Sequence, residues 1–403
     1  MSARILHIAD LHIGYTPSFL PPDKARARAE DFRSAFQRAA DFALKPESSI
    51  NAVIIGGDLF DCSTPDEATR GFVRAQLGRL SSASMPVLVV PGTHDTIAIP
   101  ESVYRRESFP AGVHILAEPF SSVPLELLLN GEKFSFYWLT YEPGEKRTIG
   151  QFLREIKADL PPDAHKVFIA HASLMGSPEW DMRRKDLPVS LDDLFSSGMH
   201  YAALGHYHGF FESPQGQSSK GQTKVVYPGT LEGKAFGENG CRYLVVVNFD
   251  DNGIRVEKTP FNCRTLEEMT LSLDSEPVSS EEELLKRLES LRNKNLILKL
   301  TITGNPDFMI RAGFLAEALA GKFFHIEIED ATSALSSIPV EEFLHERTIR
   351  GMFVRKLKEA IEALPEADSL EARSSLRAVC ELALKEGMSA FDEKGITASV
   401  KKE

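Results

Sequence analysis

The stretch VVPGTHDTIAIP, Val89–Pro100, joins an apolar strand to a Pro-Gly turn. The strand begins at Val87, and the turn presents Thr93, His94 and Asp95 directly after it. In open α/β sheets, ligands bind beyond the carboxyl ends of the strands. A strand that ends in a histidine and an aspartate therefore indicates a site for binding or chemistry.

We call such a junction between a strand and a polar turn a corner. Four further corners have the same form, with an apolar strand followed by side chains that can bind metals. Corners that end alike at the carboxyl ends of strands are expected to converge on one place. The side chains are Asp10 and His12 in IADLH, Asp58 and Asp61 in GGDLFD, His171 in IAHAS, and His206 and His208 in LGHYH.

These residue types fit a pair of metal ions. Imidazole and carboxylate together suit manganese, iron or zinc, whereas an all-oxygen set would suit magnesium or calcium. A carboxylate can bridge two cations, and two metals about 4 Å apart can clamp a phosphate and activate a water. Taken alone, D-x-H is more often a pair of exposed polar residues, Gly-Asp-x-x-Asp a turn and His171 a core histidine, whereas H-x-H is about equally often a metal site. All five in order favour a shared site.

The pattern of elements predicts an α/β layered fold with a partly parallel sheet. Residues 4–9 and 52–55 are expected strands, and residues 24–43 and 65–80 are expected helices. A small β-α-β unit follows residue 260, and the chain becomes helical after about residue 340. We expect domains at 1–260, 261–335 and 336–403, listed in chain order.

Composition limits the class of protein. At 403 residues, 42% of them hydrophobic, the chain is long enough for two or three domains. The net charge of −12 argues against indiscriminate binding of polyanions. No apolar run is long enough for a membrane span and the start lacks a signal peptide, so a cytoplasmic location without membrane attachment is expected. The cysteines are scattered and indicate reduced thiols: Cys62, Cys241, Cys263 and Cys380.

The ordered corners resemble the calcineurin-like metallophosphoesterases, whose pattern is D-x-H, G-D, G-N-H-[DE], H and G-H-x-H. This resemblance implies a layered β-sandwich flanked by helices and two divalent metal ions, with manganese preferred over iron or zinc. It places His94 near the leaving oxygen as a general acid or transition-state stabiliser. The implied ligands are Asp10, His12 and His208 for one metal and His171 and His206 for the other, with Asp58 bridging.

Further motifs resemble the SbcD-type nucleases of DNA double-strand-break repair. They are ILHIADLHIG, GGDLFD, and YPGTLEG followed by FGENG. The resemblance implies a capping domain at 261–335 that helps to hold DNA. It also implies a helical segment at 336–403 that binds an SbcC-type coiled-coil ATPase, and it allows a homodimer.

The C-terminal segment can also be interpreted directly. Val354, Leu357, Ile361 and Leu364 fall at helical spacing, with basic residues such as Arg355 beside them. Such a stripe indicates either a docking surface for a partner or a helix packed on its own domain.

The chain departs from the family pattern at Thr93, where the family has Asn. A threonine hydroxyl is shorter and a poorer neutral ligand than an amide oxygen, so a weaker second metal is expected. Asp61 and Asp95 are further candidates for metal ligands or for groups that support them.

The function expected is a metal-dependent DNA exonuclease. The alternatives are a phosphatase or phosphodiesterase with a small substrate, and a scaffold of weak activity that binds DNA and the ATPase.

Overall fold

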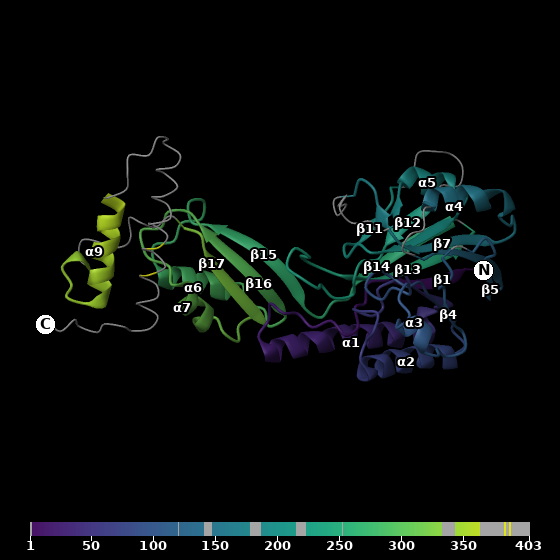
Figure 1. The fold of residues 1–403 in the computed structure, drawn as a ribbon, viewed down its shortest axis with the longest axis horizontal. Coiled ribbons are helices and arrows are strands. Elements are labelled where there is room, and N and C mark those ends of the chain that lie inside the picture. The colour runs from purple at the N-terminus through teal and green to yellow at the C-terminus, as the bar shows by residue number, and fades with distance from the viewer. Residues whose placement is uncertain are drawn as a thin grey trace. The chain divides into compact units, whose positions relative to one another are not determined.

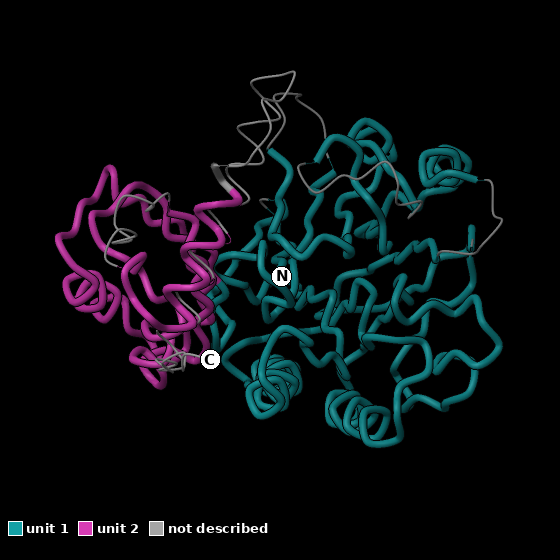
Figure 2. Tube along the Cα trace, turned by 60° about the vertical axis from the view of Figure 1, so that its left-hand side comes forward, with its two compact units in different colours: residues 1–266 teal, residues 267–403 magenta. Residues whose placement is uncertain are grey.

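The computed structural model describes residues 2–119, 121–140, 147–177, 187–214, 223–251, 253–332 and 343–362, with positions 383 and 387. Two compact units divide the chain, residues 1–266 and residues 267–403 (Figure 2). The domain limits expected at residues 260 and 335 remain predictions.

The first sheet of unit 1 has the strand order β14-β13-β1-β2-β3-β4. Strands β1 to β4 pair in parallel, and β13 pairs antiparallel with β1 and β14. The predicted parallel sheet is therefore confirmed for the strands that carry three of the corners. The strands are β1 (Ala3–Ile8), β2 (Ala52–Ile55), β3 (Val87–Val89), β4 (Val113–Ile115), β13 (Tyr243–Asp250) and β14 (Gly253–Pro260).

The second sheet has the order β11-β12-β10-β7-β6-β5. Its four central strands, β12, β10, β7 and β6, pair in parallel, so the corners after β7 and β10 lie at the same edge. The strands are β5 (Leu125–Leu129), β6 (Glu132–Leu139), β7 (His165–His171), β10 (Tyr201–Gly205), β11 (Phe211–Glu212) and β12 (Lys224–Tyr227).

Helices cover the outer faces of both sheets (Figure 1). Helices α1 (Pro22–Leu44) and α2 (Glu67–Ser82) pack on the first sheet, and α4 (Ile149–Ile156) and α5 (Leu191–Ser196) pack on the second. The layered β-sandwich flanked by helices is thus confirmed. The remaining short elements are η1 (Pro46–Ser48), α3 (Val103–Arg106), η2 (Lys157–Asp159), β8 (Ser173–Leu174) and β9 (Pro188–Val189).

Successive side chains of β1 point to opposite faces of the sheet, so this one strand contributes to two hydrophobic cores. Leu6 and Ile8 face the core beneath α1 and α2, whereas Ala3 and Ile5 face the core between the sheets. Phe36 of α1 is fully buried in the first of these cores, where it contributes about 2–3 kcal/mol. A buried sandwich of this kind holds the strand ends, and so the corners, in fixed positions.

A three-stranded sheet in the order β15-β16-β17, with β16 and β17 parallel, lies in unit 2 except for the first two residues of β15. The Ser280 hydroxyl accepts a hydrogen bond from the Glu283 amide at 3.2 Å, so the expected cap begins α6. The elements are β15 (Thr265–Ser272), α6 (Glu281–Ser290), β16 (Leu296–Thr303), α7 (Ala312–Ala318), β17 (His325–Asp330) and α9 (Ile349–Glu362).

Helix α9 uses part of its apolar stripe inside its own unit. Val354 is fully buried, and Leu357 packs against the same small cluster. Ile349 and Met352 are instead 40% and 41% exposed. The side chain of Ile361 and the whole of Leu364 lie outside the described residues.

Across the described ranges, no helix combines the length and the hydrophobicity that a bilayer span needs.

Candidate metal centre

The corners of the first sheet are joined by hydrogen bonds that continue beyond the strand ends. The Asp10 amide donates to the Gly57 carbonyl at 3.0 Å, and the His12 amide donates to the Asp58 carbonyl at 2.9 Å. The ladder between β1 and β2 therefore extends into the loops. This pairing places the side chains of Asp10, His12 and Asp58 at one edge of the sheet.

A second contact brings the two sheets together at this edge. The backbone amide of His206, which follows β10, donates to the Asp10 carboxylate at 3.1 and 3.2 Å. His171 is the last residue of β7, the neighbour of β10. The predicted ligands from both sheets therefore converge.

Four of the six predicted ligand residues have positive φ angles: Asp10 (53°), His12 (45°), Asp58 (49°) and His206 (109°). A residue with a side chain in this region of backbone space costs on the order of 1 kcal/mol or more. Strain of this kind persists only where surrounding contacts enforce it, and it is concentrated at functional sites.

Two glycines are required by the close approach of the loops. A side chain at Gly57, where φ is +100°, would collide with the His171 ring. A side chain at Gly92 would collide with the Asp58 carboxylate and backbone. Both residues leave the space that the adjacent ligand side chains occupy.

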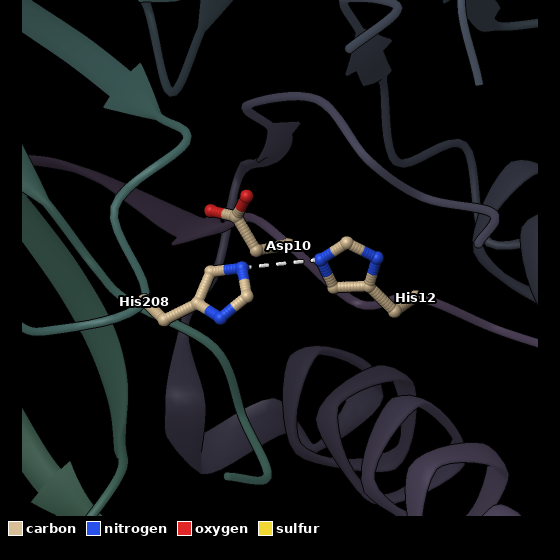
Figure 3. A group of neighbouring side chains, drawn as sticks. All are labelled: Asp10, His12 and His208. Carbon is tan, nitrogen blue, oxygen red and sulfur yellow. Dashed lines mark hydrogen bonds between the residues drawn. The ribbon is translucent and has the colours of Figure 1, made fainter. Parts of the chain in front are cut away.

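Asp10, His12 and His208 form the first ligand group (Figure 3). The Nε2 atoms of His12 and His208 lie 3.2 Å apart. Two imidazole nitrogens bound to one cation at about 2.1 Å, with tetrahedral or octahedral angles, would lie about 3.0–3.4 Å apart. The separation therefore fits two ligands of one metal, with the Asp10 carboxylate as the third.

The predicted second ligand group is Asp58, His171 and His206; Asp58 and His171 lie together with Asp10 as a possible ligand group, and His206 lies beside His171. His171 Nε2 lies 3.3 Å from His206 Nδ1, again the spacing of two ligands of one cation. Asp58 Oδ2 lies 3.4 Å from His171 Nε2 and 3.8 Å from His12 Nε2. One carboxylate thus faces ligands of both groups, so the residues present fit two divalent cations.

Charges in this buried site are strongly coupled. Burial raises the pKa of Asp10 to about 7. Burial opposes charge on Asp58 and His171 as well, but their mutual attraction prevails. It lowers the pKa of Asp58 and raises that of His171 to about 10. A proton on His171 thus balances Asp58, and a cation bound there has to displace that proton.

His94 stands beside the ligand groups with its ring about half exposed. Its amide donates to Asp58 Oδ1 at 2.8 Å, and its Nδ1 donates to the Asp61 carbonyl at 3.1 Å. A ring held through Nδ1 presents Nε2 outward. Because His94 also lies close enough to His12 and Asp58 to form a possible ligand group with them, geometry alone permits chemistry or metal binding.

The Asp95 carboxylate binds protein groups through hydrogen bonds. It accepts hydrogen bonds from the Gly92 amide (2.6 Å), the Phe60 amide (3.1 Å) and the Tyr104 hydroxyl (2.6 Å). Asp95 therefore fixes the turn that carries His94. Thr93 lies half-buried in the same turn, and its weak coordination remains a prediction.

Two residues of the site were not identified from the sequence. Glu238 Oε1 accepts a hydrogen bond from His208 Nδ1 at 2.7 Å, and Lys234 Nζ lies 3.1 Å from His12 Nδ1. The candidate ligand Asp61 lies on the same side, with Oδ1 3.1 Å from His12 Nδ1. A signal was available in the sequence, because Glu238 lies within FGENG and Lys234 directly follows YPGTLEG, two motifs noted for resemblance but given no chemical role.

Replacing Asp58 with Asn should reduce bound Mn²⁺ from two ions per chain to one or none. The amide can still accept from the His94 amide, but it lacks the charge that a bridging ligand needs. Calorimetric titration with Mn²⁺ and elemental analysis of the dialysed protein measure the change. Asp41→Asn, on the exposed face of α1, is the matched control and should keep both ions. Two ions bound to Asp58→Asn with unchanged affinity would exclude a bridge.

Replacing Thr93 with Asn should tighten the weaker of two Mn²⁺ sites, because an amide oxygen reaches further and coordinates better than a hydroxyl. Parallel Mn²⁺ titrations of the natural and variant proteins give the two dissociation constants. Equal, tight binding at both sites in the natural protein would show that Thr93 is no handicap.

Comparison with known proteins shows which family the chain resembles. Residues 3–210 match the family model described as calcineurin-like phosphoesterase. The chain is 24% identical over 330 residues to the DNA double-strand break repair protein Mre11 of Methanosarcina acetivorans, covering 79% of this chain and 48% of that protein. It is 28% identical over 261 residues to the uncharacterized metallophosphoesterase YhaO of Bacillus subtilis, covering 62% and 59%.

A dimetal phosphatase of known structure from Danio rerio aligns with a TM-score of 0.43 and 12% identity, covering 64% of this chain and 96% of that one. The chain spans about half the length of the first curated relatives that it matches. The family match covers just over half of the chain and includes every predicted ligand and His94. The chain therefore belongs to the calcineurin-like phosphoesterases, a family that hydrolyses phosphoester bonds.

Proposed function

We propose that this protein is a metal-dependent nuclease that hydrolyses phosphodiester bonds at DNA ends during repair. The observation that carries the proposal is the single Asp58 carboxylate facing two ligand groups, beside a half-exposed His94. A DNA substrate is supported by the relatives named as double-strand break repair proteins. We propose manganese as the metal and the cytoplasm as the location.

The two cations would neutralise charge on the phosphodiester and activate a water. The chain's own groups then have distinct tasks. Asp58 Oδ2 would connect the two ligand groups, because it faces a histidine of each. Its other oxygen, Oδ1, accepts a hydrogen bond from the His94 amide. The Asp61 carbonyl holds His94 Nδ1, so that Nε2 can give a proton to the departing 3′ oxygen.

The second unit supports a macromolecular substrate and partner. We propose that residues 1–260 form the nuclease domain, that 261–335 help to hold DNA, and that 336–403 bind an SbcC-type coiled-coil ATPase. A homodimer is part of the same proposal. Support comes from the separate compactness of unit 2 and from the exposed Ile349 and Met352 of α9.

The deciding experiment measures cleavage of linear duplex DNA with Mn²⁺, with and without an SbcC-type ATPase and ATP. A small ester, bis-p-nitrophenyl phosphate, is the second substrate. Cleavage of DNA that the ATPase stimulates would support the proposal. Turnover of the ester or of nucleotides without cleavage of DNA would favour a small-substrate enzyme. Binding of DNA without hydrolysis of either substrate would favour the scaffold.

Replacing His94 with Ala should preserve bound Mn²⁺ and lower kcat by roughly 10²-fold or more, because a general acid would be lost. Cleavage assays and Mn²⁺ titration of the same preparation separate chemistry from binding. His114→Ala, remote in sequence from the corners, is the matched control. Loss of one metal together with activity would make His94 a ligand.

Removing residues 340–403 should spare hydrolysis of the small ester and abolish binding to the ATPase. A milder variant, Ile349→Glu with Met352→Glu, should weaken that binding without disturbing the buried Val354. Co-purification and calorimetry measure both effects. A truncated protein that still co-purifies with the ATPase would place the docking site elsewhere.

A further inference from the structure

We infer that the loop from Thr230 to Arg242, here called the bracing loop, supplies two positioning residues, Glu238 and Lys234, for the first ligand group. They hold His208 and His12 in the orientation that binds a cation. The inference rests on the proposed two-metal site, and it adds residues to which no role in metal binding has been assigned.

Glu238 acts on His208. An ionised carboxylate only accepts hydrogen bonds, so the contact of 2.7 Å with Glu238 Oε1 requires a proton on His208 Nδ1. The lone pair of the neutral ring is then on Nε2, the atom that faces His12. A carboxylate behind a ligating histidine fixes its tautomer and ring orientation and makes it a better ligand.

Lys234 acts on His12 through Asp61. Its Nζ lies 2.8 Å from Asp61 Oδ1, and the same oxygen lies 3.1 Å from His12 Nδ1. Lys234 Nζ itself lies 3.1 Å from His12 Nδ1, but an ammonium only donates, so Asp61 is the group that can accept an Nδ1 proton. Lys234 holds that carboxylate in place, and the Nδ1 proton leaves His12 Nε2 free for a cation. The ammonium is mostly buried and lies 4.8 Å from the centre of the Tyr15 ring.

The bracing loop is itself tied to the ligands. The Lys234 amide donates to Glu238 Oε2 at 2.8 Å, so the two positioning residues are coupled. The His208 carbonyl accepts from the Thr230 amide at 3.1 Å and from Arg242 Nη1 at 2.9 Å. A change in the loop is therefore transmitted directly to His208.

A buried ion pair fixes the start of the bracing loop to α1. Arg28 Nη1 lies 2.7 Å from Glu232 Oε2, and Arg28 Nη2 donates to the Gly233 carbonyl at 2.6 Å. Both side chains are almost fully buried, and a buried pair of this kind is costly to break. The loop thus approaches the ligands from a rigid base.

The second ligand group is supported differently. His171 Nδ1 donates to the Gly56 backbone carbonyl at 3.0 Å, a neutral acceptor that belongs to the sheet edge. Among the contacts of the described residues, the bracing loop reaches His12 and His208 but not His171. Changes at Glu238 and Lys234 should consequently alter one of the two metal affinities and leave the other unchanged.

The test is a Mn²⁺ titration of the full chain by calorimetry, with the natural protein and three variants. Glu238→Gln keeps the shape and removes the charge, and it should weaken one class of site by about 10–100-fold. Lys234→Met should weaken the same class, and Lys234→Arg should restore part of the affinity. Glu257→Gln, which alters an exposed carboxylate paired with Arg4, should change neither class.

A second readout is the tautomer of His208 in the metal-free protein, measured by ¹⁵N NMR of the imidazoles at a pH high enough for the ring to be neutral. The natural protein should show the Nδ1-protonated form, and Glu238→Gln should show a mixture. Unchanged tautomer and unchanged affinities in a folded Glu238→Gln variant would overturn the inference while leaving the two-metal site intact. A natural protein that binds no Mn²⁺ would overturn both.

Discussion

The hydrogen bond from the His206 amide to the Asp10 carboxylate joins the carboxyl ends of two sheets. Each sheet alone presents only part of the ligand set, Asp10, His12 and Asp58 on one side and His171, His206 and His208 on the other. The site therefore exists only because the sandwich is packed so that these two edges meet. The cores on both faces of each sheet keep that meeting point fixed.

The protein concentrates charge and backbone strain at this junction. Asp10 and Asp58 are buried carboxylates close to several imidazoles, and four ligand residues have positive φ angles. Neither feature stabilises a fold by itself. Both become understandable if bound cations balance the carboxylates and if the surrounding hydrogen bonds hold the loops in a geometry prepared for them.

Support for the ligands differs between the two groups. His12 and His208 are backed by the carboxylates of Asp61 and Glu238, whereas His171 is backed by a peptide carbonyl. An imidazole backed by a carboxylate is the stronger ligand, which favours tighter binding of the first cation. Thr93, which stands where the family pattern has Asn, is expected to weaken binding of the second cation. A tighter first cation and a looser second one therefore remain the prediction, which the Mn²⁺ titrations test.

The sequence by itself determined much of this protein. Apolar runs alternating with helical patterns predicted a layered α/β fold with a partly parallel sheet, and the resemblance of the motifs to a known family implied the sandwich. The polar corners IADLH, GGDLFD, PGTHD, IAHAS and LGHYH predicted which strand ends converge. These features are local, because a few consecutive residues contain both the apolar pattern of a strand and the side chains that can bind a metal. The cap of α6 at Ser280 was predictable for the same reason.

Only the tertiary structure decided which groups touch across long stretches of chain. Glu238 meets His208 from 30 residues away, and Lys234 meets His12 from 222 residues away. Asp95, a candidate ligand by position, instead binds backbone amides and Tyr104. Likewise Val354 belongs to an apolar stripe for which the sequence left both docking and internal packing open, and it packs inside its own unit. A carboxylate, an ammonium or an apolar stripe has several possible partners, and packing selects among them through distances that no local pattern contains.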